Sequence, residues 1–132
     1  MSQRILIVED NEDNLLIYRT ILTHSGFEVI EARDGGEAVR MALEENPAVI
    51  LMDVSLPVMD GWEATRQIRS RETGHVPIVA LTAHARAEDR ATSMQAGCDS
   101  FLSKPAAPRE VLNEVKRLLE AEQAAGAEPE PV

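Results

Sequence analysis

The chain has 132 residues, 44% of them hydrophobic, and carries a formal net charge of -10 at pH 7. This length is typical of one domain that buries its own core. The single cysteine, Cys98, excludes an internal disulfide and favours a reducing compartment. The negative charge disfavours direct binding to nucleic acids or anionic membranes. Because we find neither a secretion signal nor an apolar run near the roughly 18 residues that span a bilayer, we expect a cytoplasmic protein.

Short apolar runs alternate along the chain with longer segments of helical period. Three of the runs are continuous and rich in β-branched residues, which is typical of parallel strands buried on both faces. In chain order, the predicted strands are 5–8, 29–30 with their flanks, 49–52, 78–81 and 101–102. The predicted helices are 14–25, 36–45, 61–71, 87–96 and 108–123. This alternation predicts an α/β fold with a parallel sheet covered by helices on both faces.

Several residues mark where the predicted helices end and which faces they bury. Gly26 and Gly97 follow helical segments, as C-terminal stops do. The last helix places apolar residues on one face, namely Val111, Leu112, Val115, Leu118 and Leu119. The third helix carries a cluster of basic residues with no aromatic residue among them, which predicts a solvated face: Arg66, Arg69 and Arg71. The Ala-, Gly-, Pro- and Glu-rich residues 124–132 predict a disordered tail.

The informative polar residues fall where the apolar runs end. Glu9 and Asp10 follow the first run, Asp53 ends the third, Thr82 ends the fourth, and Lys104 follows the fifth. In open parallel sheets, ligands bind outside the carboxyl ends of the strands. We therefore expect these side chains to converge on one edge of the sheet.

Such a group of residues suits the binding of a metal ion and a phosphoryl group. Three carboxylates close together repel one another, and a hard divalent cation such as Mg²⁺ relieves the repulsion. Lys104 adds an ammonium and Thr82 a hydroxyl, so that the set provides what an anionic phosphoryl group requires. An aspartate such as Asp53 can also act as a nucleophile and form an acyl phosphate.

Each of these residues has an ordinary structural interpretation as well. Glu9 and Asp10 can favour the start of a helix, Thr82 can end a strand, and Lys104 can be a solvated lysine. The combination at four strand ends favours the functional interpretation. The stretch DNEDNL (10–15) lacks the glycine and the closing glutamate of a calcium loop, and the histidines lack metal-ligand spacing.

Four motifs, in order, resemble those of the receiver domain of two-component response regulators: ILIVEDNEDN, VILMDVSLPVMDG, PIVALTA and FLSKPA. The resemblance covers residues 4–123. It implies one receiver domain over 1–123, with a flavodoxin-like (βα)5 fold whose five parallel strands have the order 2-1-3-4-5. It also implies a phosphorylation switch that catalyses only its own phosphoryl transfer and dephosphorylation.

The resemblance implies a role for each residue of the metal site. Asp53 is similar to the phosphoacceptor of the family. The carboxylates of Asp10 and Asp53 and the backbone carbonyl of Ser55 would bind Mg²⁺, for which Mn²⁺ or a similar divalent ion can substitute. Glu9 stands where the family often has aspartate, and its longer side chain would act through water. The Ser55 position tunes the dephosphorylation rate in the family.

Further positions correspond to the switch residues of the family. Thr82 is similar to the switch hydroxyl that moves toward the phosphoryl group, and Lys104 to the lysine that pairs with this group. Phe101 occupies the switch aromatic position, where some members have tyrosine. The Lys104–Pro105 peptide bond would be cis, which the tertiary amide of proline permits.

The resemblance also implies partners. Asp53 would receive its phosphoryl group from a sensor histidine kinase or a histidine phosphotransfer protein. A downstream protein target would contact the face formed by the fourth helix, fifth strand and fifth helix, which includes 86–96, Phe101 and the polar side of 108–123. The alternatives are an aspartyl-phosphate phosphohydrolase, which typically has a second acid where Ser55 stands, and a pseudo-receiver that binds partners without phosphorylation.

Overall fold

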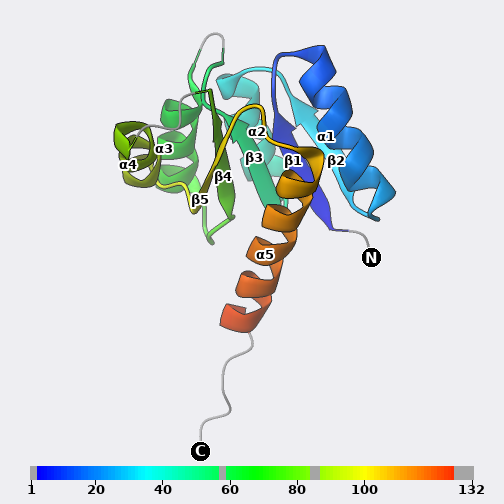
Figure 1. Ribbon diagram of the computed structural model, residues 1–132. Helices are drawn as coiled ribbons and strands as arrows, with labels where there is room; N and C mark the ends of the chain where they lie inside the picture. Colours follow the sequence, from blue (N-terminus) through cyan, green and yellow to red (C-terminus); the bar gives the residue numbers. More distant parts are fainter. Residues whose placement is uncertain (1–2, 57–58, 84–86, 127–132) are drawn as a thin grey trace, which may run out of the picture.

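A five-stranded parallel sheet forms the centre of the computed structural model, which describes residues 3–56, 59–83 and 87–126, the side chains of 123–126 excepted. The strands lie in the order β2-β1-β3-β4-β5, as predicted (Figure 1). Every pair of neighbouring strands runs in parallel. The strand bounds are β1 Arg4–Val8, β2 Glu28–Ala32, β3 Val49–Asp53, β4 Ile78–Thr82 and β5 Ser100–Ser103.

Helices cover both faces of the sheet (Figure 1). One face carries α1 (Glu12–His24) and α5 (Pro108–Gly126). The other carries α2 (Gly35–Glu45), α3 (Gly61–Arg71) and α4 (Ala87–Ala96). The predicted flavodoxin-like α/β architecture is therefore confirmed.

Three helices differ in their bounds from the prediction, although α2 does so only by beginning at Gly35 instead of residue 36. The sequence pattern predicts a first helix from residue 14, but α1 begins at Glu12 because the side chain of Asn11 caps it by accepting a hydrogen bond from the N–H of Asn14, at 3.0 Å. Helix α5 continues to Gly126 instead of ending at Gln123, since the alanine and glutamate residues near its end favour helix. Residues 127–132 of the predicted tail lie outside the described residues.

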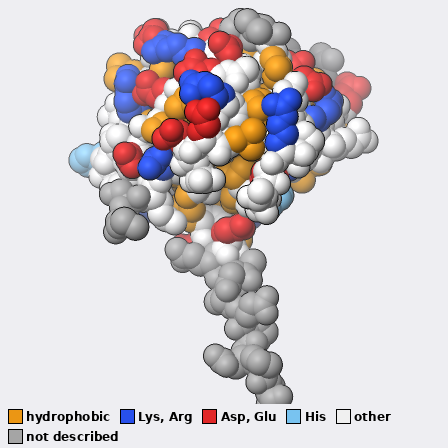
Figure 2. Space-filling view, turned by 180° about the vertical axis from the view of Figure 1, so that it is seen from behind, with side chains coloured by type: hydrophobic (Ala, Val, Ile, Leu, Met, Phe, Trp, Pro, Cys, Tyr) orange, Lys and Arg blue, Asp and Glu red, His pale blue; other side chains and the backbone are white. Residues whose placement is uncertain are grey.

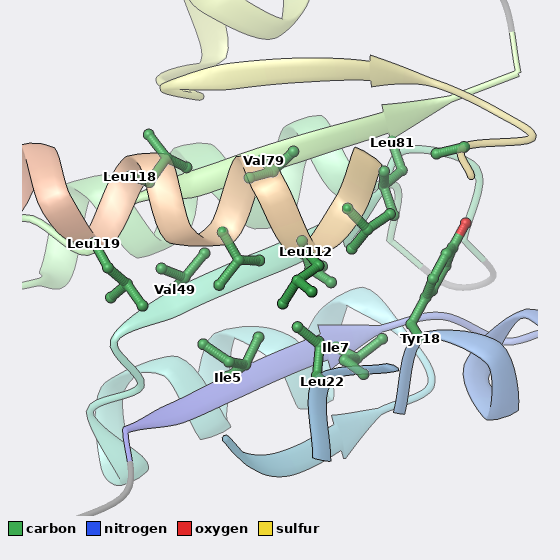
Figure 3. Close-up of a cluster of buried hydrophobic side chains, with 14 of the residues drawn as sticks. Ile5, Ile7, Tyr18, Leu22, Val49, Val79, Leu81, Leu112, Leu118 and Leu119 are labelled. Carbon is green, nitrogen blue, oxygen red and sulfur yellow. The ribbon is translucent and has the colours of Figure 1, made fainter. Parts of the chain in front are cut away.

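The core consists of two layers, one on each side of the sheet. Along β1, Ile5 and Ile7 point toward α1 and α5, whereas Leu6 and Val8 pack on the α2–α3 side. Figure 3 shows the first layer, where Leu112, Leu118 and Leu119 of α5 lie over the strands. The predicted apolar face of the last helix is buried. Burial on both faces explains why the strand runs are continuously apolar.

The structure corrects the interpretation of the arginine cluster on α3. Arg66 and Arg71 are exposed, as predicted, but the side chain of Arg69 is only 16% exposed. Its Nε donates to the carbonyl of Gly97 at 2.8 Å, and its Nη2 donates to Asp99 Oδ2 at 2.7 Å. Arg69 therefore joins α3 to the turn after α4, because its long side chain reaches a carboxylate that is remote in sequence.

On the α2–α3 side of the molecule, basic side chains lie beside acidic and hydrophobic ones (Figure 2). Exposed ion pairs along these helices, such as Arg40–Glu44 at 3.1 Å and Arg66–Glu63 at 3.6 Å, belong to this side. Pairs of this kind contribute at most about 0.5 kcal/mol each. Among the described residues, no helix combines the length and apolarity needed to cross a membrane.

The two glycines that begin α2 give a prediction about stability. A Cβ on Gly35 would lie 2.3 Å from the backbone oxygen of Met59, whereas a Cβ on Gly36 would lie 3.4 Å from its nearest neighbour, an oxygen of Asp34. We expect Gly35→Ala to lower the free energy of unfolding by about 1–3 kcal/mol through overpacking. Gly36→Ala should raise it by up to about 1 kcal/mol, because alanine favours helix. Urea denaturation measures both, and equal stability of the two variants would contradict the prediction.

Candidate functional site

The predicted site residues meet at one edge of the sheet, beyond the carboxyl ends of the strands. Asp53 is the last residue of β3, and Glu9 and Asp10 directly follow β1. The carboxylate oxygens of these three residues approach within 4.8 Å of one another. Lys104, which follows β5, donates from Nζ to Glu9 Oε1 and to Asp53 Oδ2, both at 3.1 Å. Strand register thus brings together residues that are up to 95 positions apart.

Burial distinguishes the three carboxylates from one another. Glu9 and Asp53 are buried, with 0% and 2% of their surface exposed, whereas Asp10 is exposed. Asp53 Oδ1 accepts a hydrogen bond from the N–H of Ser55 at 3.0 Å, and Glu9 Oε2 accepts one from the N–H of Asn11 at 3.2 Å. Buried carboxylates need such partners to remain charged. The site therefore has two fixed inner carboxylates and one that faces solvent.

Burial and neighbouring charges shift the pKa values of the inner groups. Burial raises the pKa of Glu9 from the ordinary 4.5 to about 6, and the neighbouring Asp53 adds to the increase. Burial opposes the charge on Lys104, but the carboxylates of Asp53 and Glu9 outweigh it and raise the pKa of Lys104. Burial also raises the pKa of Tyr18, whose hydroxyl marks the end of the α1–α5 core near this site (Figure 3).

The donor set suits a divalent cation. Three ionised carboxylates and one ammonium leave two negative charges at the site. Carboxylate oxygens at this spacing are ligands that Mg²⁺ prefers. The helix-capping interpretation does not explain Glu9, because Asn11 is the residue that caps α1. The geometry therefore supports the interpretation of these acids as a candidate metal site.

The remaining predicted residues lie on β4, on β5 and in the loops that follow β3 and β5. Thr82 is buried at the end of β4, and its backbone oxygen accepts a hydrogen bond from the N–H of Lys104 at 2.7 Å. Ser55 is exposed in the loop after β3. Phe101 is partly buried on β5, in register with Ala80, and the Lys104–Pro105 peptide bond is cis.

Two residues of structural importance to the site did not emerge from the sequence. A Cβ on Gly61 would lie 2.3 Å from the backbone oxygen of Asp53, so the start of α3 is in direct contact with this strand end. Tyr18 shares the inner face of α1 with Leu15 and Leu22. The spacing of these three residues is the signal that could have assigned Tyr18 to the core.

This fold and this site define a class of protein, a doubly wound α/β domain with an acidic centre and a lysine at the carboxyl edge of its sheet. The family model of the response regulator receiver domain matches residues 5–116. The chain therefore belongs to the response regulator receiver family, which acts in two-component signalling, and the resemblance seen in the sequence is confirmed.

Individual relatives agree with this assignment. The polar-differentiation response regulator DivK of Brucella ovis is 38% identical over 120 residues, which cover 90% of this chain and 98% of the relative. The stretch VEDNEDN (8–14) also resembles DivK.

Solved structures support the fold. One similar structure is the receiver domain of the sensor histidine kinase PA1611 from Pseudomonas aeruginosa, with a TM-score of 0.84 and 42% sequence identity. The match covers 91% of this chain and 99% of that one. That structure has a magnesium ion coordinated in its active-site cleft. A CheY-like receiver domain from Methanospirillum hungatei has a TM-score of 0.87 and 30% identity, with coverage of 95% and 99%.

The raised pKa of Glu9 predicts a pH dependence of stability in the metal-free protein. Between pH 4.5 and about 6 the folded protein binds more protons at Glu9 than the unfolded chain does. The contribution of Glu9 to the free energy of unfolding is therefore fully present below pH 4.5 and is lost as the pH rises through about 6. We expect Glu9→Gln to remove this decline, which amounts to about 1–2 kcal/mol.

Urea denaturation in the presence of a chelator, at pH 5 and at pH 7.5, measures this effect. The change in unfolding free energy between the two pH values should be less negative in the variant than in the wild type. Identical pH profiles for the two proteins would contradict the assignment of the titration to Glu9.

Proposed function

We propose that the protein is a phosphorylation switch that accepts a phosphoryl group on Asp53 in a Mg²⁺-dependent reaction. The observation that carries this proposal is the buried Asp53 carboxylate, bonded to Lys104 within a cluster of three acids. A carboxylate held in this way is fixed in place for attack, and the lysine beside it can neutralise an incoming anion.

The metal would be held by the carboxylates of Asp10 and Asp53 and by the backbone carbonyl of Ser55. Glu9 would act through a water molecule, because Glu9 is buried and already binds Lys104 and the N–H of Asn11. When bound, the cation neutralises negative charge on the oxygens of the transferred group. Mn²⁺ offers similar chemistry and should substitute for Mg²⁺.

The proposed donor is a phosphohistidine on a sensor histidine kinase or a histidine phosphotransfer protein. A carboxylate oxygen of Asp53 attacks phosphorus, the phosphorus–nitrogen bond breaks, and the imidazole leaves with the electron pair of that bond. An acyl phosphate forms on Asp53. Lys104, which donates to Asp53 at 3.1 Å, can then donate to an oxygen of the phosphoryl group.

The new charge would act on the switch residues. Thr82 lies at the end of β4, and its backbone is tied to that of Lys104 by a 2.7 Å hydrogen bond. We propose that the hydroxyl of Thr82 turns toward the phosphoryl group and that Phe101 on β5 responds to this movement. These two residues would form the two-state element that phosphorylation biases.

The surface formed by α4, β5 and α5 is the proposed contact for a downstream protein target. A hollow on this surface is lined by Arg90, Met94, Phe101, Glu114 and Arg117, among others. Met94 is 48% exposed. Arg86, which the prediction also assigned to this surface, lies outside the described residues.

The first test is the covalent adduct. We expect one phosphoryl adduct in intact-mass spectra when the protein is incubated with Mg²⁺ and acetyl phosphate, and none after chelation of the metal. Asp53→Ala should abolish the adduct because it removes the nucleophile. Asp13→Asn, which removes an exposed carboxylate in the first turn of α1, should leave it unchanged.

A phosphorylated histidine kinase should serve as a second donor, since small donors can react slowly. The proposal fails if neither donor modifies the wild type, or if Asp53→Ala is modified to the same extent.

The second test concerns Lys104. We expect Lys104→Ala to slow phosphorylation without abolishing it, and to remove the response of α4 and β5 to phosphorylation, because the phosphoryl group then lacks its ammonium partner. Hydrogen exchange of residues 87–103, with and without phosphodonor, measures the response. Lys116→Ala, an exposed lysine of α5, is the control. A normal exchange response in Lys104→Ala would argue against the assigned role.

A further inference from the structure

Helix α4 is held in place by few apolar contacts. Of its ten residues, all of which the structure describes, only Ser93 and Ala96 are buried. By contrast, α5 buries five large apolar side chains. Burial of small side chains removes little apolar surface from water and therefore contributes little stabilisation. The position of α4 must depend on a small number of specific contacts.

One of these contacts is a hydrogen bond to α3. The indole Nε1 of Trp62 donates to Ser93 Oγ at 2.9 Å. Ser93 is fully buried, with 0% of its surface exposed, and Trp62 is partly buried. A buried polar group that loses its partner destabilises the arrangement, so this bond favours one position of α4 against α3.

The backbone of Trp62 is fixed to the strand end that carries Asp53. Trp62 follows Gly61, whose N–H donates to the carbonyl of Val54 at 3.0 Å. Gly61 also lies directly against the backbone of Asp53, because a Cβ there would be 2.3 Å from the Asp53 oxygen. The indole of Trp62 therefore connects α4 to a closely packed part of the molecule.

The other end of α4 is connected to the proposed switch. The helix follows β4, which ends at Thr82. If Thr82 turns toward a phosphoryl group, we expect the start of α4, at Ala87, to be displaced with it. The hydrogen bond from Trp62 then opposes the displacement of Ser93. Helix α4 would then lie between an attachment at Trp62 that stays in place and one at Thr82 that moves.

We infer that the Trp62–Ser93 hydrogen bond holds α4 in the position it has when Asp53 is unmodified, and that it opposes the switch. This inference rests on the proposed function. In the structure Lys104 donates directly to Asp53 Oδ2, a contact that a phosphoryl group on this oxygen would break, so the observed position of α4 is the one that accompanies this contact. A contact that favours this position of α4 must reduce the affinity for any ligand that favours a different position of the helix.

The test uses beryllofluoride, an analogue of the phosphoryl group, bound with Mg²⁺ and measured by isothermal titration calorimetry. Ser93→Ala removes the acceptor, and Trp62→Phe removes the donor while an aromatic ring is kept. Each variant should bind beryllofluoride about three- to tenfold more tightly than the wild type, as the loss of one hydrogen bond predicts. The double variant should bind no more tightly than the single ones, because all three lack the same bond.

The matched control is Thr92→Ala, at the neighbouring position on α4. The Thr92 hydroxyl donates within the helix to the carbonyl of Glu88 at 2.8 Å, so its loss should leave the affinity unchanged. Urea denaturation of each variant separates switching from general stability. A purely structural bond would lower the free energy of unfolding without changing the beryllofluoride affinity.

The inference is overturned if both single variants bind the analogue as the wild type does or more weakly, or if their effects add in the double variant. These results would leave the proposed function intact as long as the wild type binds the analogue. If the wild type does not bind beryllofluoride, the proposed function fails, and the inference fails with it.

Discussion

The site depends on one ammonium group that two buried carboxylates share. Lys104 Nζ lies 3.1 Å from both Glu9 and Asp53, which are almost completely withdrawn from solvent. Without this cation, two negative charges would lie side by side in a medium that screens them poorly. With it, the acids can remain ionised, and the exposed Asp10 beside them completes a centre whose net charge a divalent cation can balance. The buried carboxylate of Asp53, whose charge is costly to remove from water, is also the group that can act as a nucleophile.

The rest of the fold keeps these groups in place. Parallel pairing sets Asp53 beside Leu81 and fixes the ends of β1, β3 and β4 at one edge. Behind this edge, both faces of the sheet are closely packed, so the inner part of the domain is rigid. Helix α4 is different, since the only side chains that it buries are the small ones of Ser93 and Ala96. A rigid site next to a weakly anchored helix is a suitable arrangement for a switch.

The sequence predicted the fold and the convergence of the acids on Lys104, since both follow from hydrophobic period and from the geometry of parallel strands. It did not predict contacts that depend on how helices pack. Arg69 resembled a solvated arginine because its partner, Asp99, lies in the turn after α4, remote from Arg69 in sequence. The hydrogen bond from Trp62 to Ser93 could likewise not be predicted, since neither residue belongs to a periodic pattern or a motif that indicates the pairing. Such contacts join residues about 30 positions apart, and only the tertiary structure brings them together.

The central claim, that Asp53 itself accepts the phosphoryl group, can be tested most directly by trapping the acyl phosphate. Borohydride reduces an aspartyl phosphate to homoserine, and peptide mass spectrometry locates the product. We expect homoserine at position 53 when Mg²⁺ and a phosphodonor are both present, and unmodified aspartate there when either is left out. Homoserine at another position, or no homoserine under the complete conditions with a phosphorylated kinase as donor, would contradict it.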